Sequence, residues 1–391
     1  MSFKYIKVKT KGQNEGENLL VPKLRFKEFN NQWNTYKLEE LVIFLDGQRK
    51  PIKDSDRNKF RGVYPYYGAS GIIDYVKDYI FDKDTILLSE DGANILTRST
   101  RLAFIASGKY WVNNHAHVLE PKNTNIYFLC ELLESLNYEQ YNTGTAQPKL
   151  NQEICKNIEL TVPDIMEQSK IGNFLSLLDK KIELQNQKIE ALKIYKRGLI
   201  QKIYQTNYNN KIKMKKILIQ KSIRNTNDKK YNVYSVNNKD GFILQTEQFK
   251  ERMVASEDTR NYKVVEKDDF AYNPARINVG SIARMKQDIK GIISPMYICF
   301  KCNEKIIPEY LEYFFESSKF TYEMNKRLEG SVRMCLSYES MLNIPIELPN
   351  KNEQEKTSEI LKSLSQKIKK EEKKYMELNM LKKGLLQKMF I

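Results

Sequence analysis

Two long segments of the chain carry apolar residues at alternating steps of four and three, the spacing of a coiled-coil seam. The first seam reads Ile171, Leu175, Leu178, Ile182, Gln185, Ile189, Leu192, Lys196, Leu199 and Ile203. The second reads Thr357, Leu361, Leu364, Ile368, Glu371, Tyr375, Leu378, Lys382, Leu385 and Met389. Both seams are polar at the same two steps, Gln185/Glu371 and Lys196/Lys382. A polar seam residue lowers stability but restricts pairing, so these positions predict control of register or partner choice.

The two seams belong to an internal repeat. Residues 160–204 align without a gap on residues 346–390, with 15 of 45 positions identical. Directly after a proline, Asp164-x-x-Glu167 and Asn350-x-x-Glu353 predict a capping box at the start of each helix. A repeat of this length fixes the architecture before any local pattern does. The chain is therefore predicted to consist of a module, a helix, a second module and a second helix.

Connectivity makes an antiparallel pairing of the two helices the simplest arrangement. Each helix of about 38 residues would be roughly 55 Å long. Two similar modules at opposite ends of such a rod would have the geometry for reading two half-sites at a fixed separation on a duplex. The alternative is that each helix is amphipathic and packs only on its own module.

The modules themselves have the pattern of a mixed α/β fold with short strands. Each also has a short helix, at 126–136 in the first module and 308–318 in the second. The predicted class is α+β, two mixed modules separated by a long antiparallel two-helix coiled coil with a pseudo-twofold repeat. The expected divisions are an extension at 1–32, modules at 33–160 and 211–345, and helices at 161–205 and 346–391. The expected strands lie within 71–81, 84–91, 101–108, 111–121, 241–247, 263–272 and 291–302.

Charge gives the first indication of a partner. The formal net charge is +16, which favours a polyanion, with nucleic acid ahead of a membrane. An AT-rich genome would also enrich lysine, asparagine, isoleucine and tyrosine, so composition leaves the question open. Five scattered cysteines suit a reducing compartment. With neither an apolar run of about 18 residues nor a signal-peptide core, we expect a cytoplasmic protein without a membrane contact.

Several stretches resemble the specificity subunits of type I restriction–modification systems. In the first half they are VPKLRFKEFNNQWNTYKLEEL at 21–41, YPYYGASGIIDYV at 64–76 and DTILLSEDGANI at 84–95. In the second half they are KDDFAYNPARINVGSIAR at 267–284 and GSVRMCLSYESMLNIPIELP at 330–349, together with the repeated helix that ends in KKGLLQKMF. The resemblance covers essentially the whole chain from about residue 21.

The resemblance implies a non-catalytic subunit that recognises DNA. Two target-recognition domains would each bind one half of a split, asymmetric site on double-stranded DNA, and the paired helices would set the gap. The helices would also dock two adenine methyltransferase subunits, and the assembly would recruit restriction/translocase subunits. No cofactor is expected in this chain; S-adenosylmethionine, ATP and Mg²⁺ would belong to the partner subunits.

Loop residues with defined donors and acceptors are the candidates for DNA contact, because such side chains read base edges while lysine and arginine bind phosphates. In the first module the candidates are Ser70, Ser89, Glu90, Asn94, Thr97, Arg98, Arg101, Asn113, Asn114, Thr145, Gln147 and Lys149. In the second they are Asn273, Arg276, Asn278, Ser281, Arg284, Ser331 and Arg333.

Other chemistries find little support in the sequence. Asn273-Pro-Ala-Arg lacks the second proline and the aromatic of an adenine methyltransferase motif, and no phosphate-binding G-x-x-x-x-G-K-[ST] is present. Neither Cys299-x-x-Cys302 nor the pair His115 and His117 has the further ligands a metal site needs. Two rival functions stay open: a metal-dependent nuclease acting through Asp164 and Glu167, and a structural coiled-coil scaffold whose modules bind protein or RNA.

Overall fold

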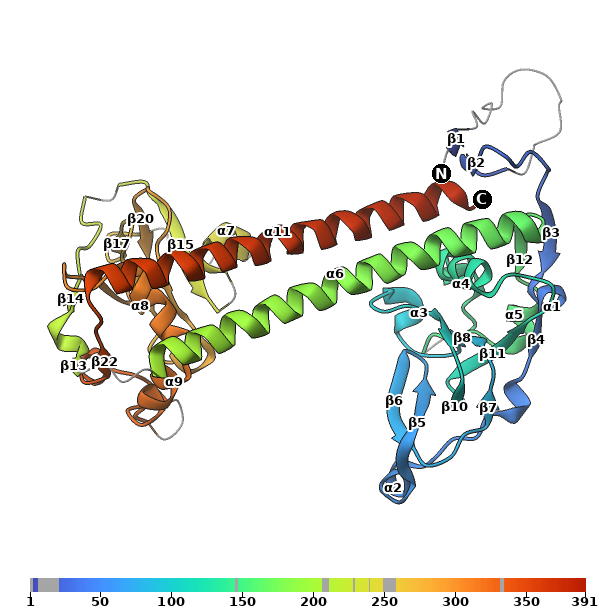
Figure 1. The fold of residues 1–391 in the computed structure, drawn as a ribbon, viewed down its shortest axis with the longest axis horizontal. Coiled ribbons are helices and arrows are strands. Elements are labelled where there is room, and N and C mark those ends of the chain that lie inside the picture. Colours follow the sequence, from blue (N-terminus) through green and yellow to red (C-terminus); the bar gives the residue numbers. More distant parts are fainter. Residues whose placement is uncertain are drawn as a thin grey trace. The chain divides into compact units, whose positions relative to one another are not determined.

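The computed structural model describes residues 3–5, 21–144, 147–205, 211–227, 229–238, 240–248, 258–330 and 334–391. The chain divides into two compact units. Unit 1 comprises Met1–Asn186 with Lys373–Ile391, and unit 2 comprises Gln187–Glu372. Each unit therefore contains one module together with parts of two long helices (Figure 1).

The two long helices are α6 (Ile165–Gln205) and α11 (Lys351–Met389), of 41 and 39 residues. None of the twenty seam residues named above is exposed, and Leu175 and Leu361 are fully buried. In unit 1 the first half of α6 pairs with the last part of α11, as the Asp179–Lys382 ion pair shows. In unit 2 the second half of α6 pairs with the first part of α11, through Lys188 and Glu371. The predicted helices and their antiparallel pairing within each unit are confirmed.

The two helix starts differ in a way that the repeat did not predict. At α11 the capping box is complete: Asn350 Oδ1 accepts from the Glu353 amide at 3.0 Å, and Glu353 accepts from the Asn350 amide at 3.2 Å. At α6 the Glu167 amide donates to Asp164 Oδ1 at 3.0 Å, but the Glu167 side chain turns to Arg25 instead. Only half of the first predicted capping box is therefore formed.

The module of unit 1 contains two four-stranded sheets. The first has the order β6-β5-β10-β7, with β5 and β10 parallel and the other neighbours antiparallel. The second has the order β4-β11-β8-β9 and is antiparallel throughout. The strands are β4 (Val42–Phe44), β5 (Arg61–Gly68), β6 (Gly71–Val76), β7 (Phe81–Asp82), β8 (Thr85–Ser89), β9 (Ala103–Ala106), β10 (Lys109–Val112) and β11 (Ala116–Pro121).

Shorter elements complete unit 1. Two strand pairs add β1 (Phe3–Tyr5) with β2 (Leu24–Phe26), and β3 (Asn34–Lys37) with β12 (Glu159–Val162). The helices are α1 (Leu38–Leu41), α2 (Asp54–Arg57), α3 (Asn94–Thr97), α4 (Ile126–Ser135) and α5 (Gln152–Lys156), with single 3-10 turns at Asp46–Gln48, Asn58–Phe60 and Glu139–Tyr141.

The module of unit 2 repeats this plan strand for strand. Its sheets have the orders β16-β15-β20-β17 and β14-β21-β18-β19, and again a single neighbouring pair, β15 and β20, is parallel. The strands are β13 (Lys211–Lys213), β14 (Leu218–Gln220), β15 (Asn232–Asn237), β16 (Gly241–Leu244), β17 (Lys263–Val265), β18 (Phe270–Tyr272), β19 (Ile282–Arg284), β20 (Gly291–Ile293), β21 (Ile298–Cys302) and β22 (Pro345–Glu347), which pairs with β13. The helices are α7 (Gln245–Gln248), α8 (Pro308–Phe315), α9 (Ser318–Asn325) and α10 (Tyr338–Leu342), with 3-10 turns at Met214–Lys216 and Ile277–Val279. The predicted α+β class with duplicated modules is confirmed.

Several expected strands are two strands rather than one. The stretch 111–121 covers the end of β10 and all of β11, separated by a turn at 113–115; 263–272 splits into β17 and β18, and 291–302 into β20 and β21. The sequence 241–247 ends in α7 rather than continuing as a strand. Short apolar runs predict strand residues well but do not show where the chain leaves one sheet for the other.

Residues 21–32 are part of the core of unit 1 rather than a separate extension. Leu24, Phe26 and Trp33 pack in one cluster with Ile171 and Leu175 of α6. The end of α11 reaches the same cluster through Met389 and the following phenylalanine. Each long helix is thus fixed to a module by buried apolar contacts as well as by its partner helix.

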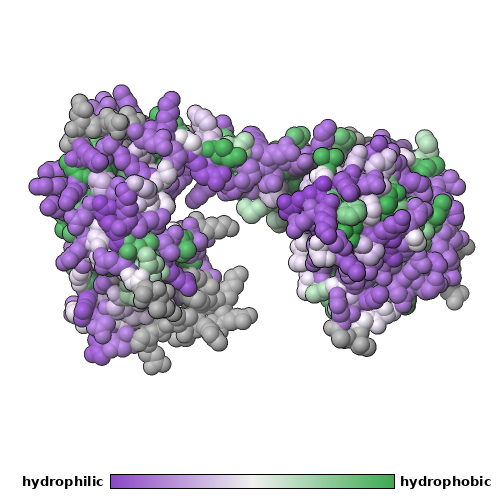
Figure 2. All heavy atoms as spheres, turned by 90° about the horizontal axis from the view of Figure 1, so that it is seen from below, coloured by the Kyte–Doolittle hydropathy of each residue, from purple (hydrophilic) through white to green (hydrophobic). Residues whose placement is uncertain are grey.

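The molecular face drawn in Figure 2 is mainly hydrophilic, with hydrophobic residues in small separate patches. Across the part of the chain that the structure describes, no helix combines the length and the apolar character needed to cross a membrane.

Candidate nucleic-acid interface

Four loops of unit 1 meet at one end of its two sheets. They are the β5–β6 turn at 68–71, the segment 90–93 after β8, the β10–β11 turn at 113–115, and residues 147–149. The Glu90 amide donates to the His115 carbonyl at 2.9 Å, and the Gly92 amide to the Pro148 carbonyl at 3.0 Å. The β5–β6 turn joins them because Ser89 Oγ donates to the Ala69 carbonyl. We call these four loops the loop cluster.

The loop cluster presents several of the predicted residues to solvent. Ser70, Asn114, Gln147 and Lys149 are exposed, and their side chains offer both donors and acceptors. Glu90 is half-buried between two cations, with Arg49 at 2.6 Å and Lys149 at 3.4 Å. These four exposed side chains are the members of the predicted set that have the position and chemistry for contact with base edges or phosphates.

Other predicted residues of unit 1 are used by the fold. Ser89 and Asn113 are buried; the first bonds backbone carbonyls and the second accepts from the His115 amide at 2.8 Å. The amide of Asn94 closes its own loop by bonding the Thr100 backbone and Ser99. Because these polar groups already have partners, their mutation would damage the domain itself, and we withdraw the three from the candidate interface.

Two of the remaining predicted residues near α3 contact α4 instead of the loop cluster. Arg98 and Arg101 form ion pairs with Glu134 and Glu131 of α4, at 3.1 and 2.5 Å. Arg98 also holds a left-handed backbone with φ of 51°. Thr97 is exposed beside them. The two arginines therefore attach the loop after β8 to α4, and their guanidinium groups are already paired with carboxylates.

Four candidates of unit 2 lie at the equivalent position, in the loop between β18 and β19, and Arg284 is the last residue of β19. Arg276 and Asn278 are exposed. Asn273, Ser281 and Arg284 are buried; Ser281 Oγ donates to the Val236 carbonyl at 3.1 Å, and Arg284 pairs with carboxylates of α8. These three are withdrawn as well. Thr145, Ser331 and Arg333 lie outside the described residues.

Sequence reasoning missed a basic face on the outer side of the β6-β5-β10-β7 sheet. Lys77 lies over the Phe60 ring at 4.5 Å and Lys109 over the Tyr79 ring at 4.7 Å. Trp111 packs edge-on against Phe60 at 6.5 Å. Further exposed cations come from the preceding segment, namely Lys50, Lys53, Lys59 and Arg61. The run RKPIKDSDRNKFR at 49–61, with six cations and two acids, was the available signal.

A buried charge network supports the loop cluster from below. His117 Nδ1 lies 2.6 Å from Asp46 Oδ2, and Nε2 lies 2.8 Å from the Leu150 carbonyl, which can only accept. Both ring nitrogens therefore donate, which requires the imidazolium form. Burial opposes this charge more than any single contact favours it, but the hydrogen bonds and charges of Asp46 and Cys155 together raise the pKa of His117 to about 10. Burial likewise opposes the charge of Asp46, yet its bond to His117 lowers the pKa of that carboxyl.

The same network bears on metal binding. Asp46, Glu90 and His117 bring one potential ligand atom each to within 4.8 Å of one another, the single such group among the described residues. A protonated imidazole has no lone pair for a metal, and Arg49 already neutralises Glu90. These residues therefore fit an ion-pair network rather than a metal centre.

The position of Glu167 argues against the nuclease hypothesis. Glu167 is fully buried, bound by Arg25 through contacts of 2.7 and 2.6 Å and by the Trp33 indole at 3.3 Å. A carboxylate held in this way cannot reach a metal ion or a scissile phosphate. Its role is to join residues 21–33 to the start of α6.

Two units with the same strand order, each with exposed polar loops and an antiparallel pairing of two long helices, define a duplicated two-module α+β protein. The family comparison makes this specific. The model of the type I restriction modification DNA specificity domain matches residues 30–193 and again 210–380. The chain belongs to this family, whose specificity subunits are the non-catalytic recognition components of restriction–modification complexes.

Individual relatives agree with the family. A putative type I restriction enzyme specificity subunit of Haemophilus influenzae is 34% identical over 143 residues, which is 36% of each chain. A type I restriction enzyme specificity subunit of Methanocaldococcus jannaschii is 25% identical over 396 aligned residues, covering 88% of this chain and 89% of that protein. The crystal structure of a type I restriction–modification S subunit from M. genitalium shares the fold with a TM-score of 0.62 at 17% identity, covering 95% of this chain and 99% of that one.

Proposed function

We propose that this chain recognises a bipartite site on double-stranded DNA, with one half-site bound by each module. The observation that supports this most directly is the duplication: both modules have the same two sheets in the same strand order, while their exposed loops differ in sequence. A shared frame with different loops suits the reading of two different half-sites. The net charge of +16 and the basic face of unit 1 supply the attraction for phosphates.

In this proposal the exposed residues have separate tasks. Ser70, Asn114 and Gln147 in unit 1, and Asn278 in unit 2, have the donors and acceptors that read base edges. Lys77 and Lys109 bind phosphates through cations already held over aromatic rings. The first group would determine which sequence is chosen, and the second how strongly and how salt-dependently DNA is bound.

We further propose that the helix pair docks two adenine methyltransferase subunits at equivalent surfaces. Ile194 and Tyr195 of α6 are 60% and 63% exposed, and their repeat counterparts Met380 and Leu381 of α11 are 74% and 53% exposed. Beside Tyr195, a shallow pocket of about 430 Å³ is lined by Ile360 and the aliphatic part of its neighbours on α11. Large apolar side chains exposed at the same place in both copies favour two copies of one protein partner.

The wider assembly follows from the family. The methyltransferase subunits would bind S-adenosylmethionine and extrude the target adenine, and restriction/translocase subunits that use ATP and Mg²⁺ would join through them. The complex would act on DNA in the cytoplasm.

The test is a genome-wide map of methyladenine in cells with and without this chain. We expect one split sequence motif to lose its methylation when the chain is removed and to regain it on complementation. A second strain carries Asn278→Ala together with Arg276→Ala in unit 2, and in it only one half of the motif should change or weaken. An identical map with and without the chain would contradict the proposal, and binding to RNA or protein in place of DNA would support the scaffold alternative.

A further inference from the structure

The short helix of each module is fixed at its start by a glutamine of the long helix that follows that module. In unit 1, Gln168 Oε1 accepts from the Asn125 amide at 3.0 Å and from Thr124 Oγ1 at 2.6 Å, directly before α4. Its Nε2 donates to the Pro163 carbonyl at 2.9 Å. One turn further on, a Cβ added at Gly172 would lie 2.3 Å from the Asn125 side chain, so the start of α4 rests on the backbone of α6.

Unit 2 repeats this attachment. Gln354 Oε1 accepts from the amide of Ile307, the residue before α8, at 2.8 Å, and its Nε2 donates to the Pro349 carbonyl at 3.0 Å. Both glutamines are buried, with 3% and 1% of the residue exposed. Gln168 and Gln354 are repeat equivalents, so two separate copies of the sequence have kept the same contact.

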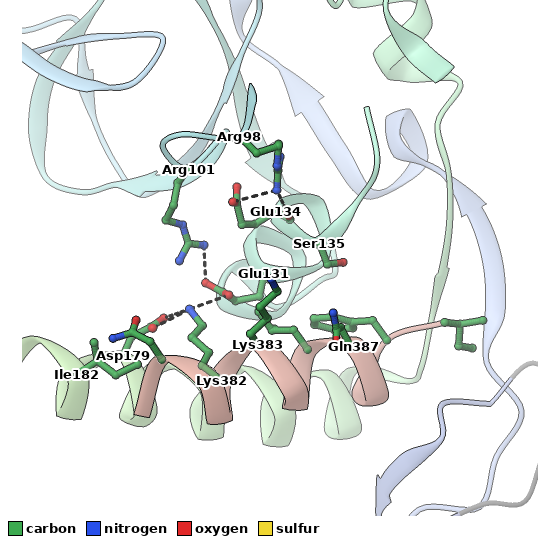
Figure 3. Close-up of a pocket in the computed structure, with 14 residues that line it drawn as sticks. Arg98, Arg101, Glu131, Glu134, Ser135, Asp179, Ile182, Lys382, Lys383 and Gln387 are labelled. Carbon is green, nitrogen blue, oxygen red and sulfur yellow. Dashed lines mark hydrogen bonds and ion pairs between the residues drawn. The ribbon is translucent and has the colours of Figure 1, made fainter. Parts of the chain in front are cut away.

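A lysine of the other long helix fixes each short helix a second time. In unit 1, Lys382 of α11 lies 2.9 Å from Glu131 of α4 and 2.6 Å from Asp179 of α6 (Figure 3). In unit 2, Lys196 of α6 lies 2.8 Å from Glu316, the residue after α8, and 5.2 Å from the Tyr313 ring. These are the two lysines that interrupt the heptad seams. Each short helix is therefore held by both long helices, through a glutamine from one and a lysine from the other.

The same short helices hold the loops of the candidate interface. Figure 3 shows Arg101 and Arg98 reaching from the loop after β8 to Glu131 and Glu134, on the side of α4 that also meets Lys382. These residues line a pocket of about 660 Å³ between that loop, α4 and the long helices within unit 1. In unit 2, Arg284 at the end of β19 binds Glu309 at 2.8 Å and Glu312 at 3.0 Å. In unit 1 ion pairs thus join the loop after β8 to α4, and in unit 2 they join the end of β19 to α8; each short helix is in turn bound to the long helices.

We infer that Lys196 and Lys382 are positioning residues for DNA recognition, which fix the angle of each module on the helix pair and thereby restrict the separation of half-sites that the protein accepts. This inference rests on the proposed bipartite DNA site. It explains why a lysine occupies a seam position in both copies: an apolar residue there would pair the long helices better but would remove the polar contact from the second long helix, leaving the glutamine and the buried apolar contacts to orient the module. A module that loses this polar restraint can tilt more easily on its apolar contacts with the long helices, and a tilting module tolerates more than one spacing.

The test uses the full chain reconstituted with its methyltransferase subunits. The substrates are duplexes that carry the two half-sites at the native separation and at one base pair more or less. In the double variant Lys196→Met with Lys382→Met, which loses the pairs with Glu131 and Asp179 in unit 1 and with Glu316 in unit 2, we expect methylation at the altered separations to rise about fivefold relative to the native one. Thermal stability should fall, because the buried Glu131 keeps only Arg101 as a partner, whereas Asp179 and Glu316 are about two-fifths exposed and stay solvated; the readout is therefore the ratio of the rates at altered and native separations.

Two controls separate positioning from general damage. Lys193→Met removes a lysine of α6 whose partners, Glu190 and Glu372, belong to the long helices alone, so the spacing preference should not change. Lys196→Arg keeps a cation within reach of Glu316 and should retain the native preference. An unchanged preference in the methionine variant, or an equal loss of methylation at every separation, would overturn the inference. If the wild-type complex methylates no split site at all, the proposed function itself fails, and the inference fails with it.

Discussion

Removing one heptad from both long helices should shorten the preferred distance between the half-sites. The segments to delete are residues 184–190 of α6 and their repeat equivalents 370–376 of α11, which contain both ends of the Lys188–Glu371 ion pair. Taking out seven residues keeps the seam in phase, since Ile182 is then followed by Leu192 at the normal step of three. At 1.5 Å per residue, each helix becomes about 10.5 Å shorter.

A duplex rises about 3.4 Å per base pair, so the shortening corresponds to at most about three base pairs. Removing three base pairs rotates one half-site relative to the other by roughly 100°. Removing seven residues takes out almost two full turns of the α-helix, which leaves a rotation of only about 20° and does not match that of the duplex. We therefore expect a new optimum one to three base pairs shorter than the native one, with a lower maximal rate because the half-sites are no longer in rotational phase.

The assay is methylation of a duplex library in which the separation of the half-sites varies, read by sequencing. The control is a variant with the same seven residues removed from α6 alone, which leaves the two helices unmatched and should lose stability without defining a new optimum. A paired deletion that folds, methylates DNA and keeps the native separation would refute the idea that the helix pair sets the distance.

Three further predictions concern individual contacts. Because the folded pKa of His117 is raised to about 10, its contribution to stability is complete below pH 6.5 and lost as the pH rises towards 10. The melting temperature should therefore fall by about 5 °C or more over this range, and much less in His117→Gln. An equal fall in both proteins would contradict the buried imidazolium. Tyr195→Asp with Leu381→Asp should abolish methyltransferase binding in analytical ultracentrifugation while the melting temperature of the free chain is retained; continued binding of two copies would exclude these surfaces. Lys77→Ala with Lys109→Ala should lower the slope of log Kd against log salt by about two for all DNA sequences, and a change confined to the target sequence would show that these lysines read bases instead.

The sequence predicted those parts of the fold in which apolar residues recur at regular steps along a single helix or strand. A seam residue such as Leu175 or Leu361 is recognisable because its neighbours at three and four residues obey the same rule. The repeat adds a second, independent copy of that evidence, which is why the helices and the duplicated plan were predictable. The helix caps were predictable to the same degree, except that Glu167 found a stronger partner in Arg25, 142 residues away. No local pattern contains a contact of that range.

The candidate interface was predicted less well, and the reason is physical. A polar residue in a loop serves either a ligand or the backbone groups that the loop leaves unpaired, and both tasks select serine, asparagine and arginine. Ser89, Asn113 and Ser281 serve the backbone, whereas Ser70, Asn114 and Asn278 face solvent, although the sequence around them looks similar. Only the neighbours in space decide which task a given residue has.

The two copies also show which contacts the duplicated design requires. Gln168 and Gln354 share two equivalent backbone contacts, with the residue before the short helix and with the proline before the long helix, and Lys196 and Lys382 both contact the short helix or the residue that follows it, although the surrounding residues differ. Asp179, which pairs with Lys382, corresponds to Ser365 in the other copy, so Lys382 contacts both the module and α6, whereas the ion pair of Lys196 is with the module. A lysine that served only to pair the helices would need an acidic partner on the other long helix in both copies, but Ser365 stands at the position equivalent to Asp179. The presence of the lysine in both copies argues that the polar seam positions are held by the attachment of the modules, and that recognition loops can diverge because the attachment beneath them stays constant.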